Sequence, residues 1–182
     1  RAELELAELE LAHPDYHWPA LTVRVAASVV NLHLGQSHDA LTTAIDAMVQ
    51  LAEAPDDVLA AYPADICSIR NNVALLFLSL GVPEPAIELL EQALLDGPVS
   101  LPAPAVRLNL AQAHLMTAQR RRAQRDPDWK LSASRCLAAV VGMNERDRQP
   151  RRLVEGATLS ASVHLLSRDL DAAGRVLVSS LN

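Results

Sequence analysis

Prolines and glycines divide this 182-residue sequence into short segments, and apolar residues recur at helical spacing within them. The run Ala86, Leu89, Leu90, Ala93 and Leu94, for example, follows the i, i+3, i+4, i+7, i+8 pattern of one helix face. Because proline and glycine end or kink helices, this punctuation predicts many short helices. The punctuating residues are Pro14, Pro19, Gly35, Pro55, Pro63, Gly81, Pro83, Pro85, Gly97, Pro98, Pro102, Pro104, Pro127, Gly142 and Pro150.

The composition favours an all-α fold. Leu (31 residues) and Ala (30 residues) are good helix formers and make up a third of the chain, whereas aromatic residues make up only 3%. Sandwiches, barrels and other sheet-centred folds are therefore disfavoured. The spacing predicts helices over residues 3–12, 19–34, 38–53, 63–80, 84–96, 102–123, 128–142, 150–167 and 170–181.

Several of these helices form pairs separated by a short turn, and one pair resembles a tetratricopeptide repeat (TPR). The pair runs from Asn71 to Pro98. The small residues Ala74, Ala86 and Ala93, the turn at Leu80-Gly81 and the closing Pro98 stand at the spacing of that family. Small residues let the two helices approach closely, and glycine suits the left-handed residue that commonly ends a helix.

Three further stretches match the family less closely. The stretch before the clear repeat has Ser28, Leu34-Gly35, Ala40 and Ala47. The stretch after it has Ala111, and the last stretch has Ala161, Ala173 and Ser180, with Arg168 in place of the turn glycine. Anchors at 28, 74, 111 and 161 give steps of 46, 37 and 50 residues, against a family repeat of about 34. We therefore expect degenerate, loop-expanded repeats at about 19–53, 63–98, 102–142 and 150–182, with residues 3–12 as the end of a preceding repeat.

This resemblance implies one domain over residues 1–182, a TPR-like α-solenoid in which antiparallel helix pairs stack into a right-handed superhelix. The sequence is also similar to the C-terminal TPR region of the TPR subunit of the TRAPP vesicle-tethering complex. The similarity lies in the order of three features: the motif LHLGQ, a repeat that starts with NN and has an LG turn, and a following helix with a basic, glutamine-containing extension. The function so implied is a non-enzymatic scaffold within a larger assembly, as in a membrane-trafficking tether. The alternative is a regulatory TPR domain that binds a peptide or small ligand and controls an attached enzyme or DNA-binding module.

In TPR proteins the first helix of each pair lines a concave groove, and the alignment assigns groove positions here. The groove so predicted is apolar with neutral polar edges, and apart from Asn71-Asn72 it lacks the Lys and Arg of the carboxylate clamp. Such a surface fits a helix or strand from a protein partner; the alternative is that its leucines are core between repeats. The predicted groove residues are Val29, Leu32, His33, Asn71, Leu75, Leu78, Ser79, Gln112, Leu115, Met116, Ser162, Leu165 and Leu166.

Charge is unevenly distributed along the chain. Residues 1–119 carry four basic and 15 acidic groups, whereas residues 120–152 carry ten basic and four acidic ones. The run Arg120, Arg121, Arg122 and Arg125 could contact an acidic protein surface or anionic lipid headgroups, and a solvated helix end is the alternative. Nucleic acid is a poor candidate partner, because the sequence pI is about 5.5 and only Trp129 lies near these arginines.

The sequence contains no motif for nucleotide binding or hydrolysis, so we expect no enzyme and no cofactor. His13 and His17 have metal-like i, i+4 spacing, but Pro14 lies between them and argues against a shared helix face. The adjacent Asp56 and Asp57 are expected to cap a helix.

Cys67 and Cys136 do not stand at the spacing of metal ligands and are expected to pack as small hydrophobic residues. Free cysteines of this kind indicate a reducing, cytoplasmic setting, which in the tether interpretation is peripheral to membranes. No segment is long enough to span a bilayer.

Overall fold

A computed structural model describes residues 17–96, 103–144 and 149–179, and these residues fold into α-helices without a strand. The all-α prediction is confirmed for this part of the chain. The helices are α2 (His17–His33), α3 (Ser37–Glu53), α4 (Asp56–Ala61), α5 (Pro63–Ser79), α6 (Pro83–Asp96), α7 (Ala103–Ala123), α8 (Trp129–Asn144), α9 (Pro150–Leu166) and α10 (Leu170–Ser179).

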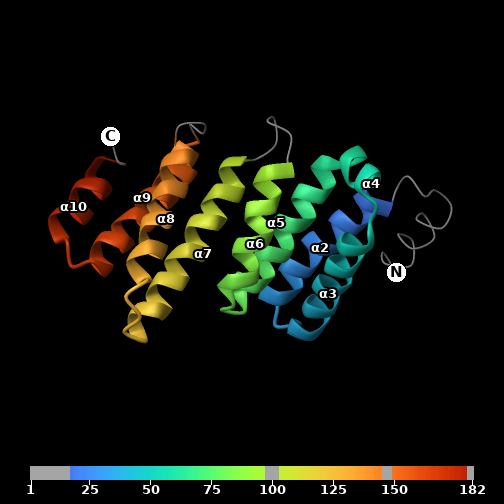
Figure 1. Cartoon of the computed structure of the whole chain (residues 1–182), viewed down its shortest axis with the longest axis horizontal. Helices are drawn as coiled ribbons and strands as arrows, with labels where there is room; N and C mark the ends of the chain where they lie inside the picture. The colour runs from blue at the N-terminus through green and yellow to red at the C-terminus, as the bar shows by residue number, and fades with distance from the viewer. Residues whose placement is uncertain (1–16, 97–102, 145–148, 180–182) are drawn as a thin grey trace.

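The helices pack as four consecutive hairpins, α2–α3, α5–α6, α7–α8 and α9–α10, which follow one another along the long axis of the molecule (Figure 1). The first helices contact one another in series, α2 with α5, α5 with α7 and α7 with α9. Each second helix also packs on the first helix of the next hairpin, as α3 does on α5, α6 on α7 and α8 on α9. Each hairpin is thus held by its own two helices and by its neighbours in the series.

The predicted helix boundaries agree closely with the observed ones, with two exceptions. The six-residue helix α4 was not predicted; it begins with Asp56 and Asp57, which place negative charge at the positive end of the helix dipole but make no side-chain capping hydrogen bond. The helix predicted at 3–12 lies outside the described residues, as does Pro98.

A residue with left-handed backbone conformation ends the first helix of every hairpin. These residues are Gly35 (φ 86°), Gly81 (φ 77°), Arg125 (φ 60°) and Arg168 (φ 63°). In each turn the amide after the left-handed residue donates to a carbonyl five residues earlier, the bond that defines a Schellman motif. The four bonds are Gln36 N–H to Asn31 O (2.9 Å), Val82 N–H to Phe77 O (2.9 Å), Asp126 N–H to Arg121 O (2.9 Å) and Asp169 N–H to His164 O (2.8 Å).

These turns fix the repeat register better than the sequence anchors do. They lie 46, 44 and 43 residues apart. Ser28, Ala74 and Ala161 each stand seven residues before the turn, and the residue at this position in the third hairpin is Ala118. The anchor assigned to Ala111 was therefore wrong by seven residues, because the first helix of that hairpin is longer and its turn contains no glycine. With this one correction, all four anchors are buried.

Alanines allow the paired helices to approach closely, as predicted. Ala86 and Ala93 of α6 are 0% and 2% exposed. The Cys67 thiol on α5 donates to the Ala93 carbonyl at 3.5 Å, which is direct contact between a side chain of one helix and the backbone of the other. Cys136 is also buried, and burial raises the pKa of its thiol to about 12. Both cysteines are thus buried core residues.

The left-handed turns predict how three substitutions that add or remove a glycine change the free energy of unfolding. Gly81→Ala should lower the free energy of unfolding by about 1 kcal/mol, because an alanine there keeps an unfavourable φ even though no atom lies within 4 Å of the new Cβ. Arg168→Gly should raise it by up to about 1 kcal/mol. Gly174→Ala is the matched control, since Gly174 has equally open surroundings but lies inside α10, where alanine is favoured. Chemical denaturation measures all three, and a shift of Gly81→Ala and Gly174→Ala in the same direction would contradict the turn assignment.

Candidate protein-binding face

The first helices of the four hairpins present one continuous face, which we call the first-helix face. The residues of this face recur at intervals of three or four along each first helix, so they lie on one side of it. Two hydrogen bonds made by residues of this face join neighbouring helices: the Thr22 hydroxyl donates to Asp65 Oδ1 (3.2 Å), and the Asn109 amide donates to Asn71 Oδ1 (2.8 Å). The face consists of Thr22, Ala26, Val29 and His33 on α2; Asp65, Ser68, Asn72, Leu75 and Ser79 on α5; Asn109, Gln112, Met116 and Gln119 on α7; and Glu155, Leu159, Ser162 and Leu166 on α9.

All of these residues are half-buried or exposed, and few are charged. Asp65 and Glu155 are its only acidic residues, and its remaining side chains are mostly apolar groups, amides and hydroxyls. Such a surface can bury aliphatic side chains of a partner while its amides bond to partner backbone, and desolvating it costs less than desolvating a charged one.

The predicted groove residues fall into two groups. On the first-helix face lie Val29, His33, Leu75, Ser79, Gln112, Met116, Ser162 and Leu166. The other group points toward neighbouring helices: Leu78 and Leu115 are 5% and 7% exposed and belong to the core. They were wrongly assigned to the groove, and the alternative that these leucines are core between repeats is correct for them.

The three remaining residues lie on the same side of their helices as Leu78 and Leu115. Leu32 packs against the core, and Asn71 accepts the hydrogen bond from Asn109. Leu165, on α9, is 51% exposed. Sequence reasoning missed nine residues of the face, which counting back from the four turns would have found: Thr22, Ala26, Asp65, Ser68, Asn72, Asn109, Gln119, Glu155 and Leu159.

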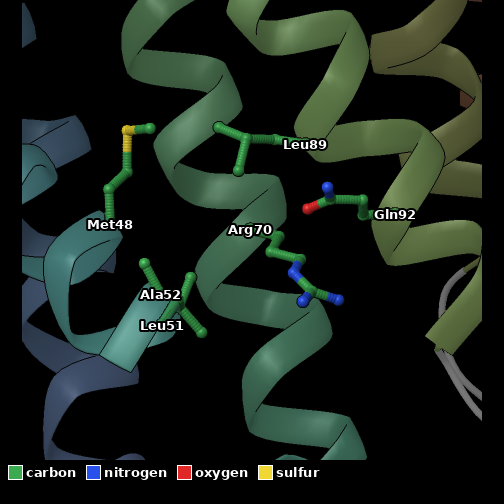
Figure 2. Close-up of a pocket in the computed structure, with 6 residues that line it drawn as sticks. All are labelled: Met48, Leu51, Ala52, Arg70, Leu89 and Gln92. Atoms are coloured by element: carbon green, nitrogen blue, oxygen red, sulfur yellow. The ribbon is translucent and has the colours of Figure 1, made fainter. Parts of the chain in front are cut away.

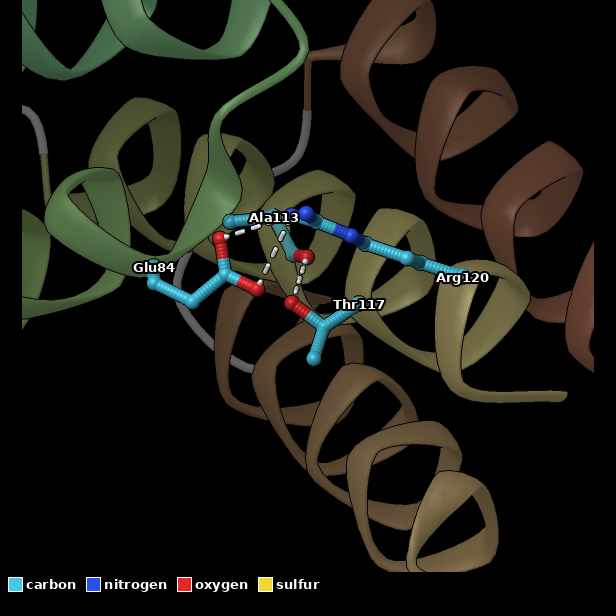
Figure 3. A network of polar contacts seen from close by, with 4 residues as sticks. All are labelled: Glu84, Ala113, Thr117 and Arg120. Carbon is cyan, nitrogen blue, oxygen red and sulfur yellow. Dashed lines mark hydrogen bonds and ion pairs between the residues drawn. The ribbon is translucent and has the colours of Figure 1, made fainter. Parts of the chain in front are cut away.

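The arginines of the predicted basic surface make contacts within the chain. Arg120 on α7 bonds both carboxylate oxygens of Glu84 on α6 at 3.4 Å, next to a bond from the Thr117 hydroxyl to the Ala113 carbonyl (Figure 3). The Arg121 Nε lies 3.7 Å from Asp126 Oδ2. The remaining two have local roles as well: Arg122 stacks over the Trp129 ring at 5.4 Å, and Arg125 is the left-handed turn residue.

These contacts predict a small stability effect for the basic surface. Replacing Arg120, Arg121, Arg122 and Arg125 together by Gln should lower the free energy of unfolding by only about 1 kcal/mol, because the Arg120–Glu84 pair is more than half exposed and the stacking on Trp129 is partly solvated. If the surface binds a partner, capture at low salt should weaken much more. A large loss of stability with intact capture would show that these arginines serve the fold alone.

A separate cavity of about 320 Å³ lies at the junction of α3, α5 and α6. Its walls are mostly aliphatic, and the side chains of Arg70 and Gln92 add a guanidinium and an amide (Figure 2). Arg70 is 8% exposed, which places a cation in a largely apolar setting. The lining residues are Met48, Leu51, Ala52, Arg70, Leu89 and Gln92.

Two histidines of the described residues, His114 and His17, lie in different surroundings. His114 is 4% exposed on α7, and burial together with the nearby Arg135 lowers its pKa to about 4. His17 meets the Trp18 ring edge-on, whereas His13 and Asp15 lie outside the described residues. The described part of the chain contains no group of three His, Cys, Asp or Glu side chains that could hold a metal ion.

Comparisons with protein families, curated proteins and solved structures found no match to this chain. Within the described residues, no helix is both long and apolar enough to span a membrane. The arrangement of the side chains themselves therefore carries the functional argument.

Proposed function

We propose that the protein is a TPR-like α-solenoid that acts as a non-enzymatic scaffold, and that its first-helix face binds a helix or an extended segment of a protein partner. The observation that carries this proposal is the continuity of the face over four helices, with accessible apolar groups, neutral polar groups and few charges. Interfaces of this kind, with a weakly charged centre, are typical of protein recognition.

The series of hairpins supports the solenoid part of the proposal. Each hairpin that precedes another contacts it through both its first and its second helix, and the period of 43–46 residues exceeds that of a TPR because the helices are long. A role as a subunit of a vesicle-tethering complex, cytoplasmic and peripheral to membranes, follows from the TRAPP resemblance.

The proposal is tested by affinity purification of the full chain followed by mass spectrometry, with two matched variants. Leu75→Glu with Met116→Glu places charge at the centre of the first-helix face. Ile45→Glu with Val49→Glu places the same charge on the outer side of α3, where these residues are 51% and 47% exposed. We expect the first variant to lose the proteins that the parent chain captures and the second to retain them.

Two results would count against binding through this face. In one, the first variant keeps its partners while remaining folded. In the other, only the α3 variant loses them, which would move the binding site to the second helices. Circular dichroism of both variants shows whether the helices are intact. Recovery of vesicle-tethering subunits among the captured proteins would support the trafficking role, and their absence would remove it.

The cavity beside Arg70 favours a second candidate function, a regulatory domain that binds a small ligand. Its volume is at the lower end of ligand sites, and an aliphatic wall with one guanidinium suits a carboxylate on a short apolar chain. Thermal shift with a series of medium-chain carboxylates tests this function. Ala52→Phe fills the cavity from an exposed position and should abolish any stabilisation seen with the parent chain.

A further inference from the structure

The outer side of α2 carries apolar residues at positions that are covered in the other three hairpins. Val23, Ala27 and Val30 stand twelve, eight and five residues before the turn residue Gly35. The residues at the same three positions in the later hairpins are Ile69, Val73 and Leu76; Ala113, Thr117 and Arg120; and Gly156, Ser160 and Val163.

In the later hairpins these positions face the preceding hairpin. Ile69, Val73 and Leu76 are at most 1% exposed, on a helix that packs against both α2 and α3. The positions on α7 and α9 are buried as well, except Arg120, which reaches back to Glu84 on the preceding hairpin. Three consecutive hairpins thus use one set of positions as a stacking interface.

On α2 the same interface is open. Val23 and Val30 are 55% and 58% exposed, and Ala27 is exposed too. Beside them a groove of about 710 Å³ runs between α2 and α3. One of the residues that line this groove is Arg24, which holds the register position that Arg70 holds at the α3–α5–α6 junction. At that junction the cover is α3, the second helix of the preceding hairpin.

The chain contains a candidate for the same place on α2. The leucine- and glutamate-rich segment 3–12 is predicted to be a helix, and four residues, 13–16, separate it from the start of α2. The connections from a second helix to the next first helix are residues 97–102 between α6 and α7 and 145–149 between α8 and α9, whereas the connection between α3 and α5, residues 54–62, is longer and includes α4. The four glutamates of the segment are opposite in charge to the Arg24 guanidinium. Its leucines would lie on two sides of a helix, as expected for the second helix of a hairpin, which contacts both its own first helix and the next hairpin.

We propose that residues 3–12 pack as a helix on Val23, Ala27 and Val30, antiparallel to α2, and so occupy the open stacking interface. This inference rests on the repeat register alone and does not depend on the partner-binding role of the first-helix face. A ten-residue helix is about 15 Å long, enough to cover the span of about 10 Å between Val23 and Val30.

Photo-crosslinking in the full chain tests the proposal. The photoreactive residue p-benzoylphenylalanine replaces Val23 or Val30 in turn, and Val49, 47% exposed on the outer side of α3, serves as the control position. Because the helix is antiparallel, position 23 should crosslink within the same chain to the C-terminal half of 3–12, and position 30 to its N-terminal half. Val49 should give no crosslink to this segment.

Several outcomes would overturn the proposal. Crosslinks between two chains at position 23 or 30 would make the occupant a second copy. The opposite order of crosslinks, equal yield from Val49, or no crosslink to 3–12 would show that this segment does not occupy the face. As a second measurement, Leu4→Asp with Leu11→Asp in the full chain should speed amide hydrogen exchange in α2 by about tenfold. Unchanged exchange would equally overturn it.

Discussion

Ala86→Leu is expected to lower the free energy of unfolding by about 1–3 kcal/mol, since the larger side chain must push α5 and α6 apart. Ala86 is 0% exposed and stands five residues after the turn residue Gly81. Ala40 and Ala173 stand at the same distance from their turn residues and are at most 3% exposed. In the third hairpin, where the second helix begins later after the turn, the corresponding buried alanine is Ala133, eight residues after Arg125. Close helix approach is therefore a shared requirement of the four hairpins. Urea denaturation followed by circular dichroism gives the change.

Ala138→Leu is the matched control for this substitution, because Ala138 lies on a second helix, α8, with its side chain exposed. Its stability should change by less than about 0.5 kcal/mol. If Ala86→Leu were equally silent, the α5–α6 interface would have room for a larger residue and the repeat register built on these alanines would be wrong.

Acidification from pH 6.5 to pH 4 is expected to remove about 3 kcal/mol of stability through His114 alone. Burial on α7, together with the charge of Arg135, lowers the pKa of His114 from 6.5 to about 4. The folded protein therefore holds a neutral imidazole at pH values where the unfolded chain binds a proton. The contribution is fully present above pH 6.5 and is lost as the pH falls toward 4.

The free energy of unfolding measured at several pH values between 4 and 7.5 checks this expectation. His114→Gln should flatten the profile over that range, whatever its effect at neutral pH, because glutamine does not titrate. His38→Gln, at an exposed position on α3, should keep the slope of the parent chain. A parent profile as flat as that of His114→Gln would show that folding does not lower the pKa of this imidazole.

The fold class and most helix ends could be predicted from the sequence because they depend on local chemistry. Gly35 and Gly81 signalled their turns directly. Arg125 gave no such signal, since an arginine rarely adopts positive φ, and this is why the third anchor was placed at Ala111 instead of Ala118. Helix α4 was missed because its six residues, between Pro55 and Pro63, are too few to show a helical period.

The candidate site was predictable only in outline. The neutral character of the first-helix face follows from helical spacing, whereas the assignment of Leu78 and Leu115 required knowing which side of each helix the next hairpin covers. The same limit applies to Arg120, whose partner Glu84 is 36 residues away and is brought near by the packing of α6 on α7.

The serial packing of the hairpins has a consequence for how the molecule loses its structure. Among the described residues, the main contacts join each helix to its own hairpin or to the next one, so no central core ties α2 to α10. Cooperativity in such a chain depends on nearest-neighbour coupling, and each outermost hairpin, which has one neighbouring hairpin among the described residues, is expected to fray at lower denaturant concentration than the middle ones. A spectroscopic probe near Trp18 and one near Trp129 would then record different unfolding midpoints, each reporting the local segment of the array.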